Sequence, residues 1–167
     1  MNIFQPAPLD DEIVQIHARS FGYVLAHVHG LFNARMAETL EGTGLHMGHV
    51  VVLATLRAQR ELHPESTLTQ TRLAEASGIE KSSLVLFLDA LEKDGWIERR
   101  RHPTDRRAHI VHLTDSGSER FNVVGVALQK RQQENLSVFS AHEQADLLRL
   151  MTRLLHHLQS DQAERTD

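Results

Sequence analysis

Cysteine is absent from this 167-residue sequence, and its absence excludes several classes of function. Without a thiol there can be no disulfide framework, no thiolate nucleophile, no Cys-ligated zinc site, no iron–sulfur cluster and no thiol-based redox sensor. Long apolar runs are missing too, since the longest, at residues 50–54, falls far short of the ~20 residues that a membrane span requires. Residues 1–12 have neither the basic nor the apolar segment of a signal peptide. We therefore expect a cytoplasmic protein with no membrane partner.

The charge is small in total but uneven along the chain. With histidine neutral the net charge is −4, which argues against indiscriminate binding to nucleic acid. Residues 1–45 carry two arginines against five carboxylates, whereas residues 99–109 carry five arginines against one aspartate. An acidic protein with one short, strongly basic segment is expected to use that segment locally. The 41% of hydrophobic residues is enough to bury a core, which excludes a disordered or collagen-like chain.

Two helices are predicted in the first part of the chain. Apolar residues at helical spacing indicate a long helix over about residues 10–40, which Gly42-Thr43-Gly44 would end. A shorter helix follows over about residues 46–61. Its inward-facing residues are expected to be Val50, Leu53, Ala54 and Leu56.

Two further helices close the chain. One starts at Thr114, and the other starts at Ser140, where Glu143 three residues later predicts a capping box. Apolar side chains cover more than half of the circumference of the last helix over residues 147–158. So wide an apolar surface on a terminal helix usually needs a second chain to cover it.

The middle of the chain has the pattern of a helix-turn-helix followed by a basic hairpin. Thr69 is a good N-cap for a helix to Ala76, and a second helix is expected from Glu80 to Asp94. Three residues suit the junction of these helices. Ala74 is small and lets the two helices approach, Gly78 can take the left-handed turn, and Ile79 is an apolar residue that would fill the junction. Residues 96–101 and 108–113 then read as two strands joined by a tight loop.

Together these elements predict a mainly α fold with a small β-hairpin wing. Residues 46–114 would form a winged helix-turn-helix DNA-binding lobe. Residues 10–45 and 115–158 would form a helical dimerisation region.

The residues that define this lobe resemble those of the MarR family of bacterial transcription regulators. The resemblance lies in the LA-x-x-x-G turn, the LE-x-x-GW-I-x-R exit from the second helix, the D-x-R of the wing and the closing LT-x-x-G. It extends over roughly residues 10–158. It implies a homodimer built from the first and the last two helices, with two lobes reading a near-palindromic operator in double-stranded DNA.

The resemblance also implies roles for residues of the wing. Arg107 would enter the minor groove, Asp105 would hold it in place, and Arg106 or Arg101 would meet phosphate. An arginine at a hairpin tip suits the narrow, electronegative minor groove. The alternative is that these arginines are simply a solvated hairpin.

At the centre of the second helix this chain departs from the family. The family commonly has Thr or Ser followed by Arg there, whereas this chain has Val85 and Leu86, which cannot make bidentate contacts to guanine. One interpretation gives base reading to polar neighbours, with Val85 or Leu86 on thymine methyl groups, which favours A·T-rich sites. In the other, Leu86 packs against another part of the protein. The complete set of expected DNA contacts is Thr71, Lys81, Ser82, Ser83, Val85, Leu86, Arg101, Asp105, Arg106 and Arg107.

Regulators of this family typically respond to a small molecule, often a phenol or an aromatic acid, bound between the dimerisation helices and the lobe. Candidate ligand-binding residues in this chain are Arg19, Tyr23, His27, His46, Met47 and His49. His46 stands where the second helix of the family tends to begin with Ser or Thr, and a poor N-cap there suggests a ligand role. The alternative for each of these residues is packing or surface exposure.

No metal site and no cofactor are predicted, but the twelve histidines raise the alternative of a zinc-responsive regulator. Only His46 and His49 have a helical separation that suits two ligands of one metal. An enzyme is not expected, since the sequence has no Gly-rich phosphate loop, no nucleophile elbow and no H-E-x-x-H. A winged helix used purely for protein contacts would lack the arginine cluster of the wing.

Overall fold

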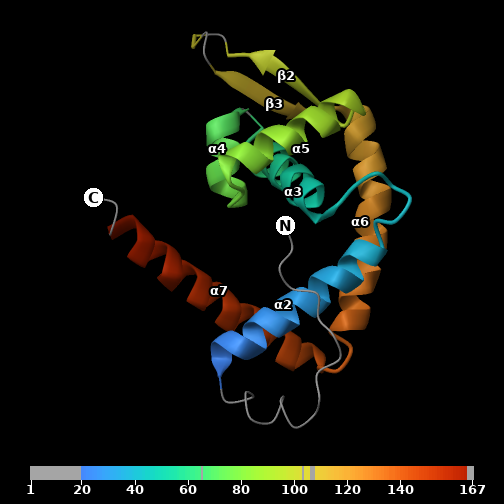
Figure 1. Ribbon diagram of the computed structural model, residues 1–167, viewed down its shortest axis with the longest axis vertical. Helices are drawn as coiled ribbons and strands as arrows, with labels where there is room; N and C mark the ends of the chain where they lie inside the picture. The colour runs from blue at the N-terminus through green and yellow to red at the C-terminus, as the bar shows by residue number, and fades with distance from the viewer. Residues whose placement is uncertain (1–19, 65, 103, 106–107, 165–167) are drawn as a thin grey trace. The chain divides into compact units, whose positions relative to one another are not determined.

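The computed structural model describes residues 20–64, 66–102, 104–105 and 108–164. The chain divides after Gln129 into two compact units. Its helices are α2 (Phe21–Glu38), α3 (Met47–Leu62), α4 (Gln70–Ser77), α5 (Lys81–Lys93), α6 (Asp115–Asn135) and α7 (Ala141–Glu164), and its strands are β1 (Leu68–Thr69), β2 (Ile97–Arg101) and β3 (His109–Leu113). The prediction of a mainly α fold with a small β wing is confirmed, and Figure 1 shows the β2–β3 hairpin projecting beside α4 and α5. No helix in the described ranges is both long and apolar enough to cross a membrane.

Helix α2 begins after Ser20, whose hydroxyl accepts a bond from the N–H of Tyr23 at 3.4 Å. The predicted start of this helix near residue 10 lies outside the described residues. Its end agrees with the prediction, because Gly42 and Gly44 take positive φ angles of 76° and 75° just beyond it. Glycine adopts such left-handed backbone without the steric cost that a Cβ would bring.

Helix α3 runs through the centre of the first unit, with contacts to α4, α5 and β3. The prediction that Ala54 faces inward is wrong, because Ala54 is exposed, whereas Val50 is half-buried and packs against the core as predicted. The buried residues of the helix are His49, Val52, Leu53 and Leu56. This spacing of i, i+3, i+4 and i+7 is a single helical stripe, and Ala54 lies ~100° around the helix from its neighbour Leu53.

The helix-turn-helix forms as predicted. The hydroxyl of Thr69 accepts a bond from the N–H of Arg72 at 3.3 Å and caps α4. Gly78 then takes φ 67°, and α5 follows with its leucines at 84, 88 and 91 no more than 2% exposed. The sheet has the order β1-β3-β2, with both pairs antiparallel. The two-residue strand β1 was not predicted, since it is too short to show an alternating pattern.

The LT-x-x-G motif fastens the wing to the start of α6. The hydroxyl of Thr114 donates to the carbonyl of Gly95 at 2.9 Å and accepts from the N–H of Gly117 at 2.8 Å. A Cβ on Gly117 would lie 2.0 Å from the carbonyl oxygen of Trp96, so only glycine fits there. The indole of Trp96 is buried at 4% exposure, with the guanidinium of Arg120 3.7 Å from its ring centroid.

The outer helices leave many apolar side chains exposed in the single chain. On α2 the exposed residues are Phe21, Val24, Leu25, Val28 and Leu31. On α7 they are Leu147, Leu148, Leu150, Met151, Leu155 and Leu158. The predicted capping box of α7 is present, since the N–H of Ser140 donates to the carboxylate of Glu143 at 2.8 Å and the N–H of Glu143 donates to the hydroxyl of Ser140 at 3.3 Å.

Candidate nucleic-acid interface

The outer face of α5 carries most of the residues that the sequence predicted to contact DNA. Lys81, Ser82, Val85 and Leu86 are all exposed, and the exposed fraction of Leu86 is 68%. Within the lobe, Leu86 does not pack into the core. Thr71 on α4 is exposed beside this face and lines a shallow groove with Lys81 and Val85.

The two serines of this face are already engaged in the free protein. The hydroxyl of Ser82 donates to the carboxylate of Glu80 in a very short bond, and the hydroxyl of Ser83 donates to the same carboxylate oxygen at 3.5 Å. These bonds, the one from Ser82 above all, hold the pKa of Glu80 below its ordinary value. Glu80 is therefore ionised at neutral pH and holds both hydroxyls near the start of α5.

The basic segment of the wing is less uniform than its sequence suggests. Arg99 donates to Glu92 at 2.5 Å and to Asp89 at 2.7 Å, and its side chain is only 22% exposed. The hydrogen bonds between Arg99 and Glu92 lower the pKa of Glu92 and raise that of Arg99. Arg99 thus fastens β2 to α5.

Two further arginines of this segment lie nearer the solvent. Arg100 is paired with Glu98 at 2.5 Å. Arg101 is exposed at the end of β2, nearest the tip of the wing.

The loop at the tip of the wing is organised around one histidine. The Nδ1 atom of His102 accepts from the backbone N–H groups of Thr104 and Asp105, at 3.3 and 3.2 Å. The predicted DNA contact Asp105 is exposed in this loop. Arg106 and Arg107 lie outside the described residues.

The argument that His46 is a poor N-cap is wrong. Its Nδ1 accepts from the N–H of Gly48 at 3.2 Å, and its own N–H donates to Nδ1 of His49 at 3.4 Å. Two imidazoles therefore make the reciprocal capping box that Ser or Thr makes with Glu elsewhere. The two rings stack at 3.7 Å between centroids, and the ring of Phe87 from α5 meets both of them edge-on.

This histidine pair is poorly suited to a metal. Burial, followed by the neighbouring His46, lowers the pKa of His49 to about 4, although Asp94 acts in the opposite direction. A shared metal would have to lie in the planes of both rings, whereas these planes are stacked with only 29° between them. In the part of the chain that the structure describes, no three His, Asp or Glu side chains gather where they could hold a metal ion.

The other predicted ligand residues lie in different settings. Tyr23 and His27 on α2 form a ring pair with 4.1 Å between centroids, and His27 Nδ1 lies 3.0 Å from the carbonyl of Tyr23. Met47 is half-buried against the core. Arg19 lies outside the described residues.

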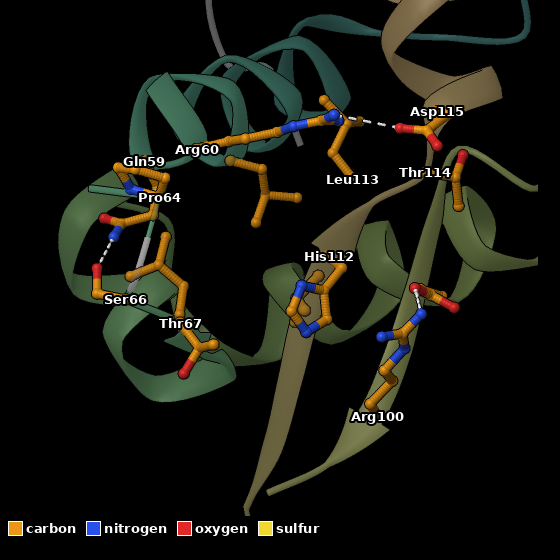
Figure 2. A pocket seen from close by; sticks show the side chains of 14 residues that line it. Gln59, Arg60, Pro64, Ser66, Thr67, Arg100, His112, Leu113, Thr114 and Asp115 are labelled. Atoms are coloured by element: carbon orange, nitrogen blue, oxygen red, sulfur yellow. Dashed lines mark hydrogen bonds and ion pairs between the residues drawn. The ribbon is translucent and has the colours of Figure 1, made fainter. Parts of the chain in front are cut away.

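A cleft that the sequence did not reveal lies between the end of α3, the sheet and the start of α6 (Figure 2). It encloses about 550 Å³. Leu56, Leu68, Val111 and Leu113 give it an apolar side, and its polar residues include Arg60, Arg100 and His112. Arg60 reaches Asp115 at 3.2 Å. Its lining comes from four separate segments, so no local motif could have predicted it.

These features define a winged helix-turn-helix protein. One face of its α5 is buried in the lobe, and the opposite face is exposed to solvent. The model of the MarR family matches residues 45–109, which run from the start of α3 to the start of β3. Over these residues the sequence resemblance is confirmed. The members of that family are transcription regulators.

Solved structures share the fold over most of the chain. A variant of MarR from E. coli in complex with operator DNA is 24% identical, with a TM-score of 0.70, 89% of this chain covered and 99% of the other. PcaV from Streptomyces coelicolor, in complex with its natural ligand, is 23% identical, with a TM-score of 0.71 and coverages of 90% and 98%. BpsR from Bordetella bronchiseptica, whose DNA binding is regulated by 6-hydroxynicotinic acid, is 18% identical, with a TM-score of 0.72 and coverages of 82% and 94%.

Proposed function

We propose that this protein is a dimeric, sequence-specific DNA-binding transcription regulator, a repressor that a small aromatic acid or phenol releases from its operator. The observation that carries the proposal is the two-faced character of α5. Its inner leucines are buried in the lobe, while its outer face is left to solvent. A helix held rigidly in this way suits the major groove of B-DNA, which is wide enough to admit one α-helix.

The exposed apolar faces of α2 and α7 support the homodimer. Large contiguous apolar surfaces are rare on soluble monomers and usually mark a contact with another chain. A symmetric dimer would present two α5 helices, and a spacing of about one turn of DNA, ~34 Å, would let both enter successive major grooves. A near-palindromic operator follows from that symmetry.

Each group of predicted DNA contacts has a distinct role in this proposal. The α5 residues Lys81, Ser82, Ser83, Val85 and Leu86 face the bases, and Thr71 at the start of α4 faces the backbone. In the wing, Arg107 enters the minor groove with Asp105 beside it, and Arg101 and Arg106 meet phosphates.

An aromatic acid is the effector that we favour, and the cleft of Figure 2 is a candidate site for it. Its apolar side would cover an aromatic ring, and the carboxylate of the ligand would replace Asp115 at Arg60 or Glu98 at Arg100, with His112 nearby. Regulation of BpsR by 6-hydroxynicotinic acid supports this ligand class. Arg19, Tyr23 and His27 remain predicted ligand residues. His46 and His49 have a structural role in the capping box of α3, and Met47 packs against the core, so a ligand is not needed to explain these three residues.

Release would follow from a shift between two conformations of the dimer. A ligand that binds more tightly to a dimer with a different spacing of the two α5 helices favours that spacing, which no longer matches successive major grooves. A tenfold loss of DNA affinity needs only about 1.4 kcal/mol of differential ligand affinity.

The test is fluorescence anisotropy of the purified protein on the intergenic DNA upstream of its own gene, titrated with aromatic acids and phenols. We expect tight binding that an aromatic acid releases. Arg60→Ala should raise the acid concentration needed for release several-fold. Arg57→Ala is the matched control, since Arg57 is also an ion-paired arginine on α3 but lies outside the cleft. No binding to any upstream DNA would overturn the proposal.

The zinc-responsive alternative gains no support from the stacked geometry of His46 and His49. A parallel titration with zinc and with a chelator tests it in the same assay. Release by zinc alone would replace the aromatic acid as the effector.

A further inference from the structure

The centre of α5 presents two apolar side chains to solvent where a DNA-reading helix usually carries hydrogen-bonding groups. Leu86 is 68% exposed and Val85 is 45% exposed. The other leucines of this helix are at most 2% exposed, so Leu86 is the exception among them. Leu86 is therefore free to contact another molecule.

The polar groups around Leu86 are largely occupied by neighbours within the lobe. Ser82, one turn before it, donates to Glu80, and Asp89, three residues after it, is paired with Arg99 at 2.7 Å. These three residues share one stripe of the helix, at i, i+4 and i+7. At the middle of this stripe, Leu86 offers only van der Waals contact.

Exposed cationic side chains of the same lobe favour DNA as the occupant of this patch. Lys81 is exposed at the first turn of α5, and Arg101 is exposed at the end of β2. Arg99 is shared by Asp89 and Glu92, so these three side chains keep one net negative charge, and the ionised Glu80 adds another near Ser82. The patch is thus apolar at its centre, with the exposed cation Lys81 on the same helix.

We infer that Leu86, with Val85 beside it, reads the C5-methyl groups of thymines in the major groove, so that a methyl group and not a hydrogen bond specifies the central bases of each half-site. The thymine methyl is the apolar feature that the base pairs of B-DNA present in that groove. This inference rests on the proposed DNA-binding function and assigns the specificity of the same surface.

The direct test removes only the methyl group from the DNA. Operators are first selected with the full-length protein from a random-sequence duplex library, and each thymine is then replaced by deoxyuridine, one symmetric pair at a time. Uracil keeps every hydrogen-bonding group of thymine. At one or two positions of each half-site we expect about a fourfold loss of affinity per methyl, the value of one buried methyl-sized group. A symmetric pair should then lose about 15-fold, the product of its two half-sites.

Leu86→Ala should abolish the difference between thymine and uracil at those positions. Leu62→Ala is the matched control, because Leu62 is a 72% exposed leucine on another helix, the last residue of α3, and should leave the difference unchanged. Both Leu86 and Leu62 are exposed, so circular dichroism should show both variants folded like the wild type.

The outcomes distinguish the failure of the methyl reading from the failure of the proposed DNA binding. Selection of an operator that binds equally well with thymine or uracil at every position overturns the methyl reading and leaves DNA binding intact. A thymine preference that persists in Leu86→Ala overturns the role of this residue. Failure to select any DNA sequence overturns the proposed function, and with it this inference; the exposed patch would then be a protein contact.

Discussion

The two faces of α5 show how one helix can serve folding and recognition with the same residue type. Leu88 is fully buried, and Leu86, two positions earlier, is 68% exposed. Two residues correspond to ~200° around a helix, so these side chains point to opposite sides. The inner leucine contributes to stability, whereas the outer leucine contributes nothing to the core and is available for a ligand. Burial thus separates two roles that residue type alone does not distinguish.

The largest expected effect is the loss of stability caused by a substitution on the inner face of α5. Leu88→Ala removes a fully buried side chain and leaves a cavity, so we expect a loss of about 2–5 kcal/mol in the free energy of unfolding. Urea denaturation followed by circular dichroism measures it. A loss below about 0.5 kcal/mol, the range of surface substitutions, would show that Leu88 is not part of the core.

A change of pH tests the burial of His49, which packs against Phe87 of α5. The pKa of His49 is lowered to about 4 in the folded protein, against 6.5 for the ordinary group. Between these values the unfolded chain binds a proton that the folded chain does not. Stability should therefore be fully present above pH 6.5 and fall as the pH drops towards 4, by about 3 kcal/mol. Burial lowers the pKa of His46 as well, which adds in the same direction.

His49→Gln provides the control for this pH dependence. A glutamine at this position can still accept the cap bond from the backbone N–H of His46, as in an ordinary capping box, but it does not titrate. Urea denaturation at several pH values should show a smaller loss of stability for the variant between pH 6.5 and 4. An unchanged pH profile would contradict the buried, neutral state of His49.

The wing offers a comparison with the outer face of α5, since both are proposed to contact DNA. Arg107→Ala should weaken DNA binding more than tenfold and leave the dimer intact, because a minor-groove arginine contributes affinity without supporting the core. Fluorescence anisotropy and size-exclusion chromatography measure the two properties. Normal affinity in this variant would refute the role of Arg107 in the minor groove.

The smallest effect on stability is expected from the outer face itself. Leu86→Ala should change the free energy of unfolding by less than about 0.5 kcal/mol, because the side chain is mostly exposed in the single chain. The same urea denaturation as for Leu88→Ala measures it. A loss approaching that of Leu88→Ala would mean that Leu86 is covered in the folded protein, and the two faces would no longer differ.

Local rules predicted most of the winged lobe from sequence. The cap at Thr69, the glycine turn at Gly78 and the capping box at Ser140 depend on residues a few positions apart, so their chemistry can be recognised in the sequence. The buried and exposed faces of α5 follow from helical spacing for the same reason.

The features that were missed depend on contacts between distant segments. The cleft of Figure 2 joins residues from α3, the sheet and α6, and the strand β1 exists only because β3 lies beside it. The capping role of His46 is local, yet it was missed because imidazole is an unusual acceptor at a helix start. Arg99 was counted with the basic wing, although Asp89 and Glu92 hold it against α5.

The central claim is that this protein binds DNA through the outer face of α5 and the basic wing. Its most direct test is the affinity of the purified protein for a selected operator, measured by fluorescence anisotropy at salt concentrations from about 50 to 200 mM. We predict a steep, linear fall of the logarithm of the association constant with the logarithm of the salt concentration, since phosphate contacts release counterions. Binding that does not change over this range, or no binding at the lowest salt, would contradict the claim.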